Sequence, residues 1–436
     1  MSQPARRQPP STSRRLWCRD LPIHQCQRHH ETTQHLPPPG SGVNGAAPWE
    51  AGATVPPGAP PAPLIAVPAS KPTSPSSASA KVRRDAPTLA DVARAAGVSE
   101  MAASSALNGS RKSSARVSEE TRERVLAAAR QLGYRPNATA RALASRRTNA
   151  IGIVATFQGE EPNLYFLEVF SGVIQGASAA GQTTSVFTLN HWKSAPAHLP
   201  AFCDGRVDGL ILLAPRLQDD GATWLPSHTP MVSVQADRPV HGLANVESDD
   251  EGGAFKMVRA LLGMGHRRIL HVAGPPDFTG SNQRVEGYLR AHAEAGVKPP
   301  AGHVIHSPLT VEGGREALER WLAARRGKVL PEVVFGCNDA IAFGCIEALK
   351  ARGLRVPEDV SVVGYDHTLM ARWVRMATVR QPLHELGRRA VELLMQRIEA
   401  SIRAEAYTGP QQLVLPTEIV LGDTLAGPRQ ARLVIT

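Results

Sequence analysis

Basic side chains are concentrated in one short part of this 436-residue chain. Between Lys81 and Ala150 there are 14 Lys and Arg residues against 6 Asp and Glu residues, a surplus of eight positive charges within a whole-chain charge of +10. Such a surplus suits the neutralisation of phosphate groups, so this segment is expected to contact nucleic acid. The candidate phosphate contacts are Arg111, Lys112, Arg116, Arg135, Arg141, Arg146 and Arg147. For each of them, the alternative is a solvated charge on the protein surface.

Residues that would indicate an enzyme or a metal site do not form a recognised pattern. The chain has no G-x-S-x-G, H-E-x-x-H or Walker motif, and His266 and Asp339 have no evident nucleophile with which to pair. The histidines and cysteines near the N-terminus fit no zinc spacing. We therefore expect no catalytic residues, no metal and no cofactor.

The cysteine count and the hydropathy bear on the compartment. Five scattered cysteines, an odd number, indicate a reducing environment. No apolar run approaches the roughly 18 residues of a membrane span, and no signal-peptide core follows the basic N-terminus. These features predict a cytoplasmic protein that does not bind membranes, and they disfavour an exported sugar-binding transport protein.

The first 85 residues are rich in Pro, Ser, Ala and Gly and show no apolar periodicity. Such a segment cannot bury enough surface to offset the entropy of ordering, so residues 1–85 are expected to form a disordered tail. The tail is also expected to be dispensable, because the folded pattern begins abruptly at residue 86.

Three short helices are expected after the tail. Thr88 and Asp91 form a cap pair for a helix over 89–96, Ser99 caps a second over 99–108, and Ser118 caps a third that Gly133 ends. A tight turn containing glycine between the first two helices is typical of a helix-turn-helix. A further Ala/Arg-rich run over 138–145, following Pro136, predicts a helix that is marginal on its own.

From residue 150 onward, apolar strand patterns alternate with helical ones, which predicts an α/β architecture with doubly wound parallel sheets and ligands at the carboxyl ends of strands. Strands are expected at 151–157, 184–189, 209–213, 231–234, 268–273, 304–306, 333–335 and 360–363. Helices are expected at 166–180, 250–264, 284–295, 313–325, 339–352 and 383–404. The length of about 275 residues favours two lobes.

A series of motifs runs through residues 87–425, namely TLADVARAAGVS, SALNG, RVDGLIL, GHRRILHVAGP, QRVEGY, CNDAIAFG, VPEDVSVVGYD, TVRQPLHELGRRAVELL and LPTEIVL. In their sequence and their order, these motifs closely resemble those of the lactose-repressor (LacI/GalR) family of transcriptional regulators. The resemblance implies an all-α headpiece, a hinge helix and a two-lobed core like that of type I periplasmic binding proteins.

The resemblance also implies domain boundaries. The headpiece is expected at 86–134, the hinge helix at 135–148, the core at 149–425 and a C-terminal tail at 426–436. Within the core, the first lobe is expected to take 149–246 and 378–406, and the second lobe 247–377 and 407–425.

For DNA binding, the resemblance places the second helix in the major groove, with Glu100, Met101 and Ala102 facing base edges. The alternative for Met101 is packing against the headpiece. Leu143 corresponds to the family's minor-groove wedge, with a hinge contact as its alternative. The full set of expected DNA-binding residues is Thr88, Ser99, Glu100, Met101, Ala102, Ser104, Ser105, Asn108, Arg116, Tyr134, Asn137, Arg141 and Leu143.

This helix departs from the common family run VSxxTVSRVLNG, because the chain reads VSEMAASSALNG. Ala102 replaces a threonine and Ser105 replaces a frequent arginine. A hydroxyl contact to phosphate and a guanidinium contact to a base are therefore expected to be lost. A second departure is Gly422, where relatives usually carry arginine.

For the effector, the resemblance indicates Arg284 in QRVEGY, Asn338 in CND and Asp366 in GYD, supported by Asp237, Phe278 and Tyr165. A guanidinium fork suits hydroxyl or carboxylate groups on a small, sugar-like ligand. A structural ion pair is the alternative for Arg284 and Asp366. The implied function is a regulator, expected to be a repressor, that binds a pseudo-palindromic operator as a homodimer under the control of a small-molecule effector.

Overall fold

The computed structural model describes residues 86–108, 117–145, 147–156, 163–217, 224–429 and 433–435. The expected tail at 1–85 lies outside these residues, as do four of the expected phosphate contacts, Arg111, Lys112, Arg116 and Arg146.

Local capping defines the first helix, α1 (Leu89–Ala96), which has the expected bounds. The Thr88 hydroxyl accepts a hydrogen bond from the Asp91 amide at 3.3 Å, and the Asp91 carboxylate accepts one from the Thr88 amide at 2.9 Å. This capping box satisfies two amides that a helix otherwise leaves unpaired. Gly97 ends the helix with φ 67°, a left-handed conformation that suits glycine.

The next two helices, α2 (Glu100–Asn108) and α3 (Glu119–Leu132), follow the expected signals. The Ser99 hydroxyl accepts from the Ala102 amide at 3.2 Å, and Gly133 ends α3 with φ 65°. The three helices share a core of small side chains, in which Val92, Ala103, Ala106, Val125, Ala128 and Ala129 are buried. Leu132, expected in this core, is 39% exposed because Ala128 and Ala129 occupy the inner face of α3.

The fourth helix, α4 (Ala138–Ser145), has the bounds predicted for the Ala/Arg-rich run. Pro136 was expected to start this element, but the cap is Asn137, whose Oδ1 accepts from the Ala140 amide at 3.3 Å. Leu143 on α4 is 85% exposed.

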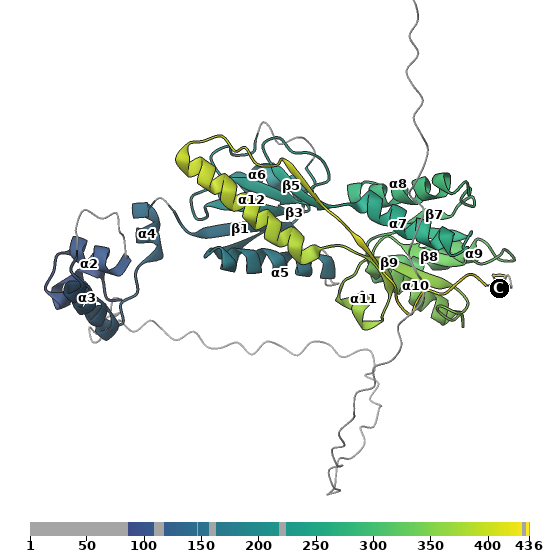
Figure 1. The fold of residues 1–436 in the computed structure, drawn as a ribbon, viewed down its shortest axis with the longest axis horizontal. Coiled ribbons are helices and arrows are strands. Elements are labelled where there is room, and N and C mark those ends of the chain that lie inside the picture. The colour runs from purple at the N-terminus through teal and green to yellow at the C-terminus, as the bar shows by residue number, and fades with distance from the viewer. Residues whose placement is uncertain are drawn as a thin grey trace, which may run out of the picture. The chain divides into compact units, whose positions relative to one another are not determined.

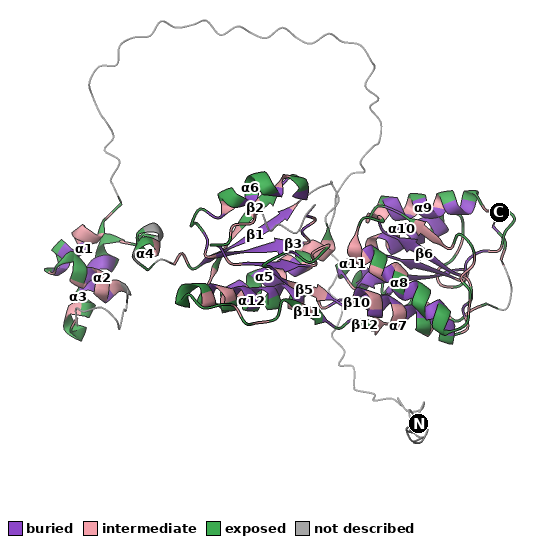
Figure 2. Ribbon diagram, turned by 90° about the horizontal axis from the view of Figure 1, so that it is seen from above, coloured by how far each residue is buried: buried purple, intermediate pink, exposed green. Residues whose placement is uncertain are grey.

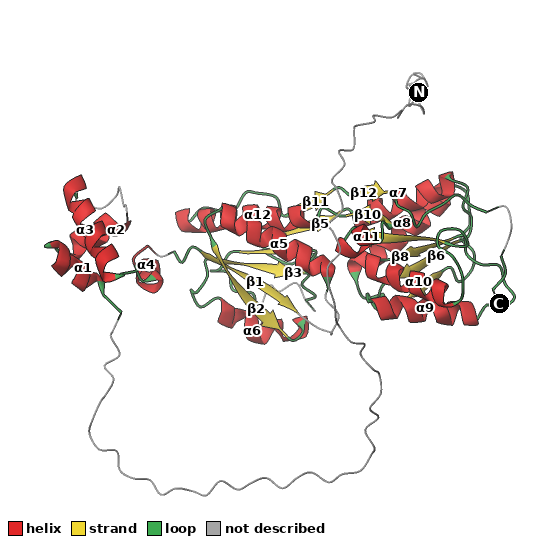
Figure 3. Ribbon diagram, turned by 90° about the horizontal axis from the view of Figure 1, so that it is seen from below, coloured by secondary structure: helices red, strands yellow, loops and turns green. Residues whose placement is uncertain are grey.

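The first lobe is built on a six-stranded sheet in the order β11-β5-β4-β3-β1-β2, whose neighbouring strands are all parallel. Its central strands are continuous apolar runs that are buried on both faces, as parallel sheets require. Helices α5 and α12 cover one face and α6 the other (Figure 3). The elements are β1 (Ala150–Thr156), α5 (Leu164–Ala179), β2 (Thr183–Leu189), η1 (Trp192–Ser194), α6 (Ala195–Phe202), β3 (Gly209–Leu213), β4 (Met231–Val234), β5 (Ala244–Ser248), α12 (Leu383–Arg403) and β11 (Gln412–Leu415).

The second lobe has a similar sheet in the order β12-β10-β9-β8-β6-β7, in which only β12 runs antiparallel to its neighbour among the described strands. Helices α7 and α8 lie on one face, and α9 and α10 on the other (Figure 1). The elements are α7 (Asp250–Gly263), β6 (Ile269–Ala273), α8 (Thr279–Glu294), β7 (Val304–His306), α9 (Val311–Ala323), β8 (Val333–Gly336), α10 (Asp339–Ala351), β9 (Ser361–Asp366), α11 (Leu369–Trp373), β10 (Ala377–Arg380) and β12 (Glu418–Val420).

The two sheets exchange strands, and this corrects the expected lobe boundaries. Strand β10, whose residues 378–380 were placed in the first lobe, pairs with β9 of the second sheet. Strand β11 was placed in the second lobe but pairs with β5 of the first sheet. The chain therefore passes between the lobes after β5, after β10 and after β11. Strand β11 lies at the edge of the first sheet and β10 lies next to the edge of the second, and neither of these short strands was predicted from hydropathy.

Burial follows the layers, with buried residues in the strands and on the inner sides of the helices (Figure 2). Helices α5 and α12 approach closely through Gly172 and Gly387, because a Cβ atom at either would meet the backbone of the other helix. No described helix combines the length and the apolarity that a membrane span needs.

Candidate nucleic-acid interface and effector site

The residues expected to read DNA lie mainly on the exposed side of α2. Glu100 and Met101 are exposed, and Met101 reaches 68%. Ala102, Ser104 and Ser105 are half-buried, whereas Ala103 and Ala106 face the headpiece core. The headpiece core, as described, does not include Met101, so the packing alternative for this side chain is not supported.

Several other expected DNA contacts have structural roles as well. The hydroxyls of Thr88 and Ser99 cap α1 and α2, and Asn137 caps α4. Tyr134 is half-buried against the headpiece core, and Arg141 is exposed. Asn108 ends α2. Arg116 lies outside the described residues, so its expected contact has no structural description.

A carboxylate that the sequence interpretation missed holds the segment between α4 and β1. Asp208, next to β3, accepts hydrogen bonds from the amides of Thr148 at 2.7 Å and Asn149 at 3.0 Å. The Thr148 hydroxyl also donates to it at 2.8 Å, and Arg147 Nε lies 3.2 Å away. The signal was present, because Asp208 lies in the quoted run RVDGLIL. The Asp208 clamp, comprising residues 147–149 and Asp208, thus fixes where the chain enters the core.

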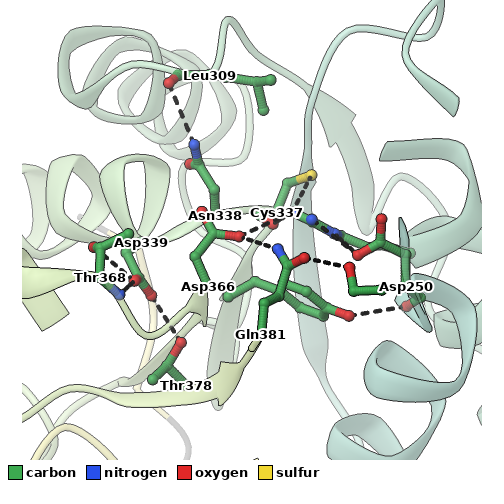
Figure 4. A network of polar contacts seen from close by, with 12 residues as sticks. Asp250, Leu309, Cys337, Asn338, Asp339, Asp366, Thr368, Thr378 and Gln381 are labelled. Carbon is green, nitrogen blue, oxygen red and sulfur yellow. Dashed lines mark hydrogen bonds and ion pairs between the residues drawn. The ribbon is translucent and has the colours of Figure 1, made fainter. Parts of the chain in front are cut away.

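Arg284 pairs with two carboxylates in a buried polar network, and Figure 4 labels both of these partners, Asp250 and Asp366. Its side chain is only 9% exposed, and its Nη2 lies 3.0 Å from Asp250 Oδ1. Its Nη1 donates to the Cys337 carbonyl at 2.5 Å and lies 3.6 Å from Asp366 Oδ1. The guanidinium also stacks on the Tyr365 ring, 3.9 Å from the ring centroid. Asp250 and Asp366 thus compensate the charge of Arg284, as the alternative of a structural ion pair expects. Asp366 also ends β9, and Asp250 closely follows β5, so both lie where a ligand is expected in such a fold.

Asp366 ends β9 in an unusual backbone conformation, with φ 108°. Its Oδ1 accepts a hydrogen bond from Gln381 Nε2 at 2.6 Å. Burial raises the pKa of Asp366 well above its ordinary value, against the opposing charge of Arg284. A non-glycine residue held at positive φ in a buried polar cluster is typical of a functional position.

Gln381 connects this network to the first sheet. Its Oε1 accepts a hydrogen bond from the hydroxyl of Ser248 at the end of β5. Gln235, which follows β4, donates to Ser248 Oγ at 3.2 Å and to Asp250 Oδ2 at 3.3 Å. Sequence interpretation missed Ser248, Gln235, Asp250 and Gln381 as site residues. Residues from both sheets therefore meet around Arg284.

Asn338 has both of its polar groups occupied within the second lobe. Its Oδ1 accepts from the Ile341 amide at 2.8 Å, which caps α10, and its Nδ2 donates to the Leu309 carbonyl at 3.3 Å. The neighbouring Asp339 is bound by the hydroxyls of Thr378 and Thr368 (Figure 4), and burial raises the pKa of Asp339 to about 7. The hydrogen bond from the Ile341 amide thus gives Asn338 a structural role as the cap of α10.

Polar atoms with unmet hydrogen-bonding capacity occur at three other residues, each of which follows a strand of the first sheet. Tyr165 Oη on α5 and Asp237 Oδ1 after β4 are buried without a hydrogen bond of ordinary geometry in the described part of the chain. Arg216, after β3, has a buried Nε in the same condition, and its guanidinium stacks 3.9 Å from the Phe278 ring centroid. Burial raises the pKa of Asp237. These groups are suited to bind hydroxyl groups of a ligand beside an aromatic surface.

Known proteins resemble both parts of the chain. Residues 88–137 match the family of bacterial regulatory proteins, lacI family, and residues 258–425 match a periplasmic binding protein-like domain. The HTH-type transcriptional repressor PurR of Haemophilus influenzae is 33% identical over 318 residues, covering 71% of this chain and 91% of PurR. The chain belongs to the LacI family. Its expected fold, a helix-turn-helix headpiece with a periplasmic-binding-protein-like core, is confirmed.

Solved structures of LacI-family regulators extend this similarity. A CelR–cellobiose complex is 30% identical with a TM-score of 0.56, covering 78% of this chain and 99% of CelR. A Lac repressor dimer bound to operator and the anti-inducer ONPF is 25% identical with a TM-score of 0.66, covering 77% and 98%. These relatives are transcriptional regulators rather than enzymes, and the present LacI-family member is a DNA-binding transcriptional regulator.

The structure explains the departure of this LacI-family member at Gly422. A Cβ atom at this position would lie against the backbone of residues 375–377, closer than real side chains approach. Gly422 therefore allows the chain after β12 to pass directly beside the segment that leads into β10. An arginine would require this backbone contact to open.

Proposed function

We propose that this LacI-family regulator represses transcription by binding, as a homodimer, to a pseudo-palindromic operator. The observation that carries the proposal is the exposed side of α2 on a folded three-helix headpiece, where Met101 and Glu100 are free of the headpiece core. One such headpiece covers a half-site, and a two-fold operator matches two copies. The solved Lac repressor relative, a dimer bound to operator, supports the same arrangement.

The hinge helix α4 is expected to complete the DNA interface. It has eight residues and an exposed Leu143, so little of its surface stabilises it within its own chain. Pairing with a second copy in the minor groove would bury Leu143 between base steps and bend the duplex. Arg141, which is exposed, is expected to neutralise a phosphate group beside it, whereas Arg147 is already paired with Asp208.

We further propose that a small sugar-like effector binds between the strand ends of the two lobes. Asp237 and Tyr165 from the first lobe, with Phe278, Arg284 and Asp366 from the second, are the residues expected to contact it. The unmet polar atoms of Asp237 and Tyr165 support a ligand rich in hydroxyl groups. The CelR–cellobiose relative supports a sugar. Asn338 is expected to contribute through α10, which it caps, rather than through a free amide.

Effector control follows from differential affinity for two arrangements of the lobes. A ligand that contacts groups on both sheets favours the arrangement in which all those contacts form. The Asp208 clamp joins the first lobe to the segment after α4, so a change in that lobe can bias the hinge helix. The size of the effect is limited by the difference in ligand affinity between the two states.

We also propose that the protein works in the cytoplasm, where a chromosomal operator is accessible, and that residues 1–85 are dispensable for folding and DNA binding. The proposed domains are the headpiece at 86–134, the hinge at 135–148, and a core whose lobes are divided as the strand exchange indicates.

The experiment that tests operator binding is a mobility-shift assay of the full chain with DNA fragments from upstream of its own gene and its gene neighbours. A specific complex should survive excess competitor DNA, and its affinity should fall steeply with salt. If no fragment is retained above competitor, the proposal of operator binding is wrong.

Effector binding is tested by thermal shift of the full chain with uncharged mono- and disaccharides, cellobiose included, followed by repetition of the DNA assay. One sugar should raise the melting temperature and change operator affinity. Arg284→Ala should abolish that response while leaving sugar-free operator affinity within about tenfold. A normal response from the variant would remove Arg284 from the site.

A further inference from the structure

Met101 lies at the centre of the exposed side of α2. A helix turns by about 100° per residue, so the buried positions Ala103 and Ala106 lie about 200° and 140° around the axis from Met101. The exposed fractions of Ala103 and Ala106 are 0% and 2%, so both are buried. The direction midway between them points almost directly away from Met101. The same helix side carries Ser104, Ser105 and Asn108 by position.

The neighbours of Met101 on this side are short or polar, so the methionine is the longest apolar side chain there. It does not belong to the headpiece core, and its 68% exposure is the largest among the large apolar side chains in the described part of the headpiece. An apolar side chain in this position gains nothing from water, and it must either remain exposed or contact a partner. In the proposed complex, its partner is the floor of the major groove.

The chemistry of the base edges restricts what a methionine can read. Each base pair presents donors and acceptors in the major groove, and the only methyl group on the unmodified bases there is the C5 methyl of thymine. A thioether is a weak acceptor with no donor, so it cannot replace water at the polar groups of guanine, adenine or cytosine. Contact with a thymine methyl, in contrast, buries apolar surface on both partners.

We propose that Met101 selects a thymine in each operator half-site by packing against its C5 methyl group. This proposal rests on the operator binding proposed above and names the base that the site prefers. Ser105 leaves room for the contact, because it follows Met101 by one helical turn and its side chain is short. Readout at this position is thus apolar rather than hydrogen-bonded.

The test begins with selection of binding sites from random duplex DNA by the full chain. In the selected operator, each thymine is replaced in turn by deoxyuridine, which removes the C5 methyl group and keeps the base pair. One position in each half-site should weaken binding about fourfold, the effect of one buried methyl-sized group, and about fifteenfold when both half-sites are changed. If every thymine tolerates deoxyuridine, the proposal is wrong.

A variant cycle then assigns the effect to Met101. Met101→Ala should weaken binding to the thymine operator but lose all sensitivity to deoxyuridine at the same position. Met264→Ala, at another exposed methionine directly after α7, is the matched control and should retain the full sensitivity. Equal sensitivity in Met101→Ala would show that another residue reads the methyl group. Selection without any enriched sequence would instead refute operator binding itself.

Discussion

Asp250 and Arg284 form an ion pair across the start of α7 and the middle of α8, with side chains only 2% and 9% exposed. Asp250 also accepts a hydrogen bond from Gln235 of the first lobe. A single carboxylate therefore holds the arginine expected to bind effector and connects it to the other lobe. The pair is part of the fold as much as of the site.

Removal of Asp250 should be costly because it leaves the Arg284 charge buried with one weaker partner. Asp250→Ala is expected to lower the free energy of unfolding by about 3 kcal/mol or more, measured by urea denaturation of the full chain. The matched control is Glu316→Ala, which breaks the exposed Arg320–Glu316 pair on α9 and should cost less than about 1 kcal/mol. Similar losses of unfolding free energy in both variants would mean that the buried pair is no more important for stability than an exposed pair.

The Asp208 clamp should matter for DNA binding. Asp208→Asn replaces one carboxylate oxygen by an NH2 group, which cannot accept the hydrogen bonds that residues 147–149 donate. These residues then gain conformational entropy, which is lost again when the protein binds its operator. Operator affinity, measured by fluorescence anisotropy, is expected to fall about tenfold. Asp204→Asn, at an exposed aspartate nearby, should leave it unchanged. Unchanged affinity in Asp208→Asn would exclude a role for the clamp in positioning the hinge.

Leu143 should separate specific from non-specific binding. Leu143→Ala is expected to reduce operator affinity by about 2 kcal/mol or more, the order of a base-step unstacking term, because the wedge is lost. Salt-sensitive binding to unrelated DNA should persist, since the basic residues remain. Leu289→Ala, at an exposed leucine on α8, serves as the control. A parallel loss of both kinds of binding would indicate that Leu143 packs within the hinge instead.

The pH dependence of stability should respond in opposite directions to two buried groups. Burial lowers the pKa of His271 to about 4, so the unfolded chain binds a proton below pH 6.5 that the folded protein refuses. Acidification from pH 6.5 to 4 should therefore cost wild type roughly 3 kcal/mol relative to His271→Phe, which keeps an aromatic ring. Below pH 4 the difference should be constant.

Asp339 should give the reverse sign. Its pKa is raised to about 7 by burial, so the folded protein binds a proton that the unfolded chain releases above pH 4. Wild type should therefore gain stability relative to Asp339→Asn as the pH falls from 7 to 4. Urea denaturation at each pH measures both differences, and other titrating groups cancel in each comparison. A slope of the same sign in both comparisons would contradict these assignments.

The parts of the fold that sequence predicted well are those with local causes. The bounds of α1 and α4 were exact because capping residues and glycines act within a few positions. Strands β5, β10, β11 and β12 were missed because they lie at or near sheet edges, and their pairing is decided by crossings between the lobes. No local pattern in the sequence records which sheet an edge strand joins.

The candidate site shows the same division. Arg284 and Asp366 were identified through motifs, but their partners Asp250 and Gln381 were not, because these residues meet only after the chain has crossed between sheets. The capping role of Asn338 could have been predicted from the local sequence. It directly precedes a helix that begins at Asp339, the position of an N-cap, and its amide oxygen is used there.

The central claim, that two copies of this chain bind one two-fold operator, is tested most directly by hydroxyl-radical footprinting of the selected operator combined with sedimentation of the complex. Two protected half-sites related by a two-fold axis are expected, with two protein chains bound to each duplex. A single protected half-site occupied by one chain at full affinity would contradict it.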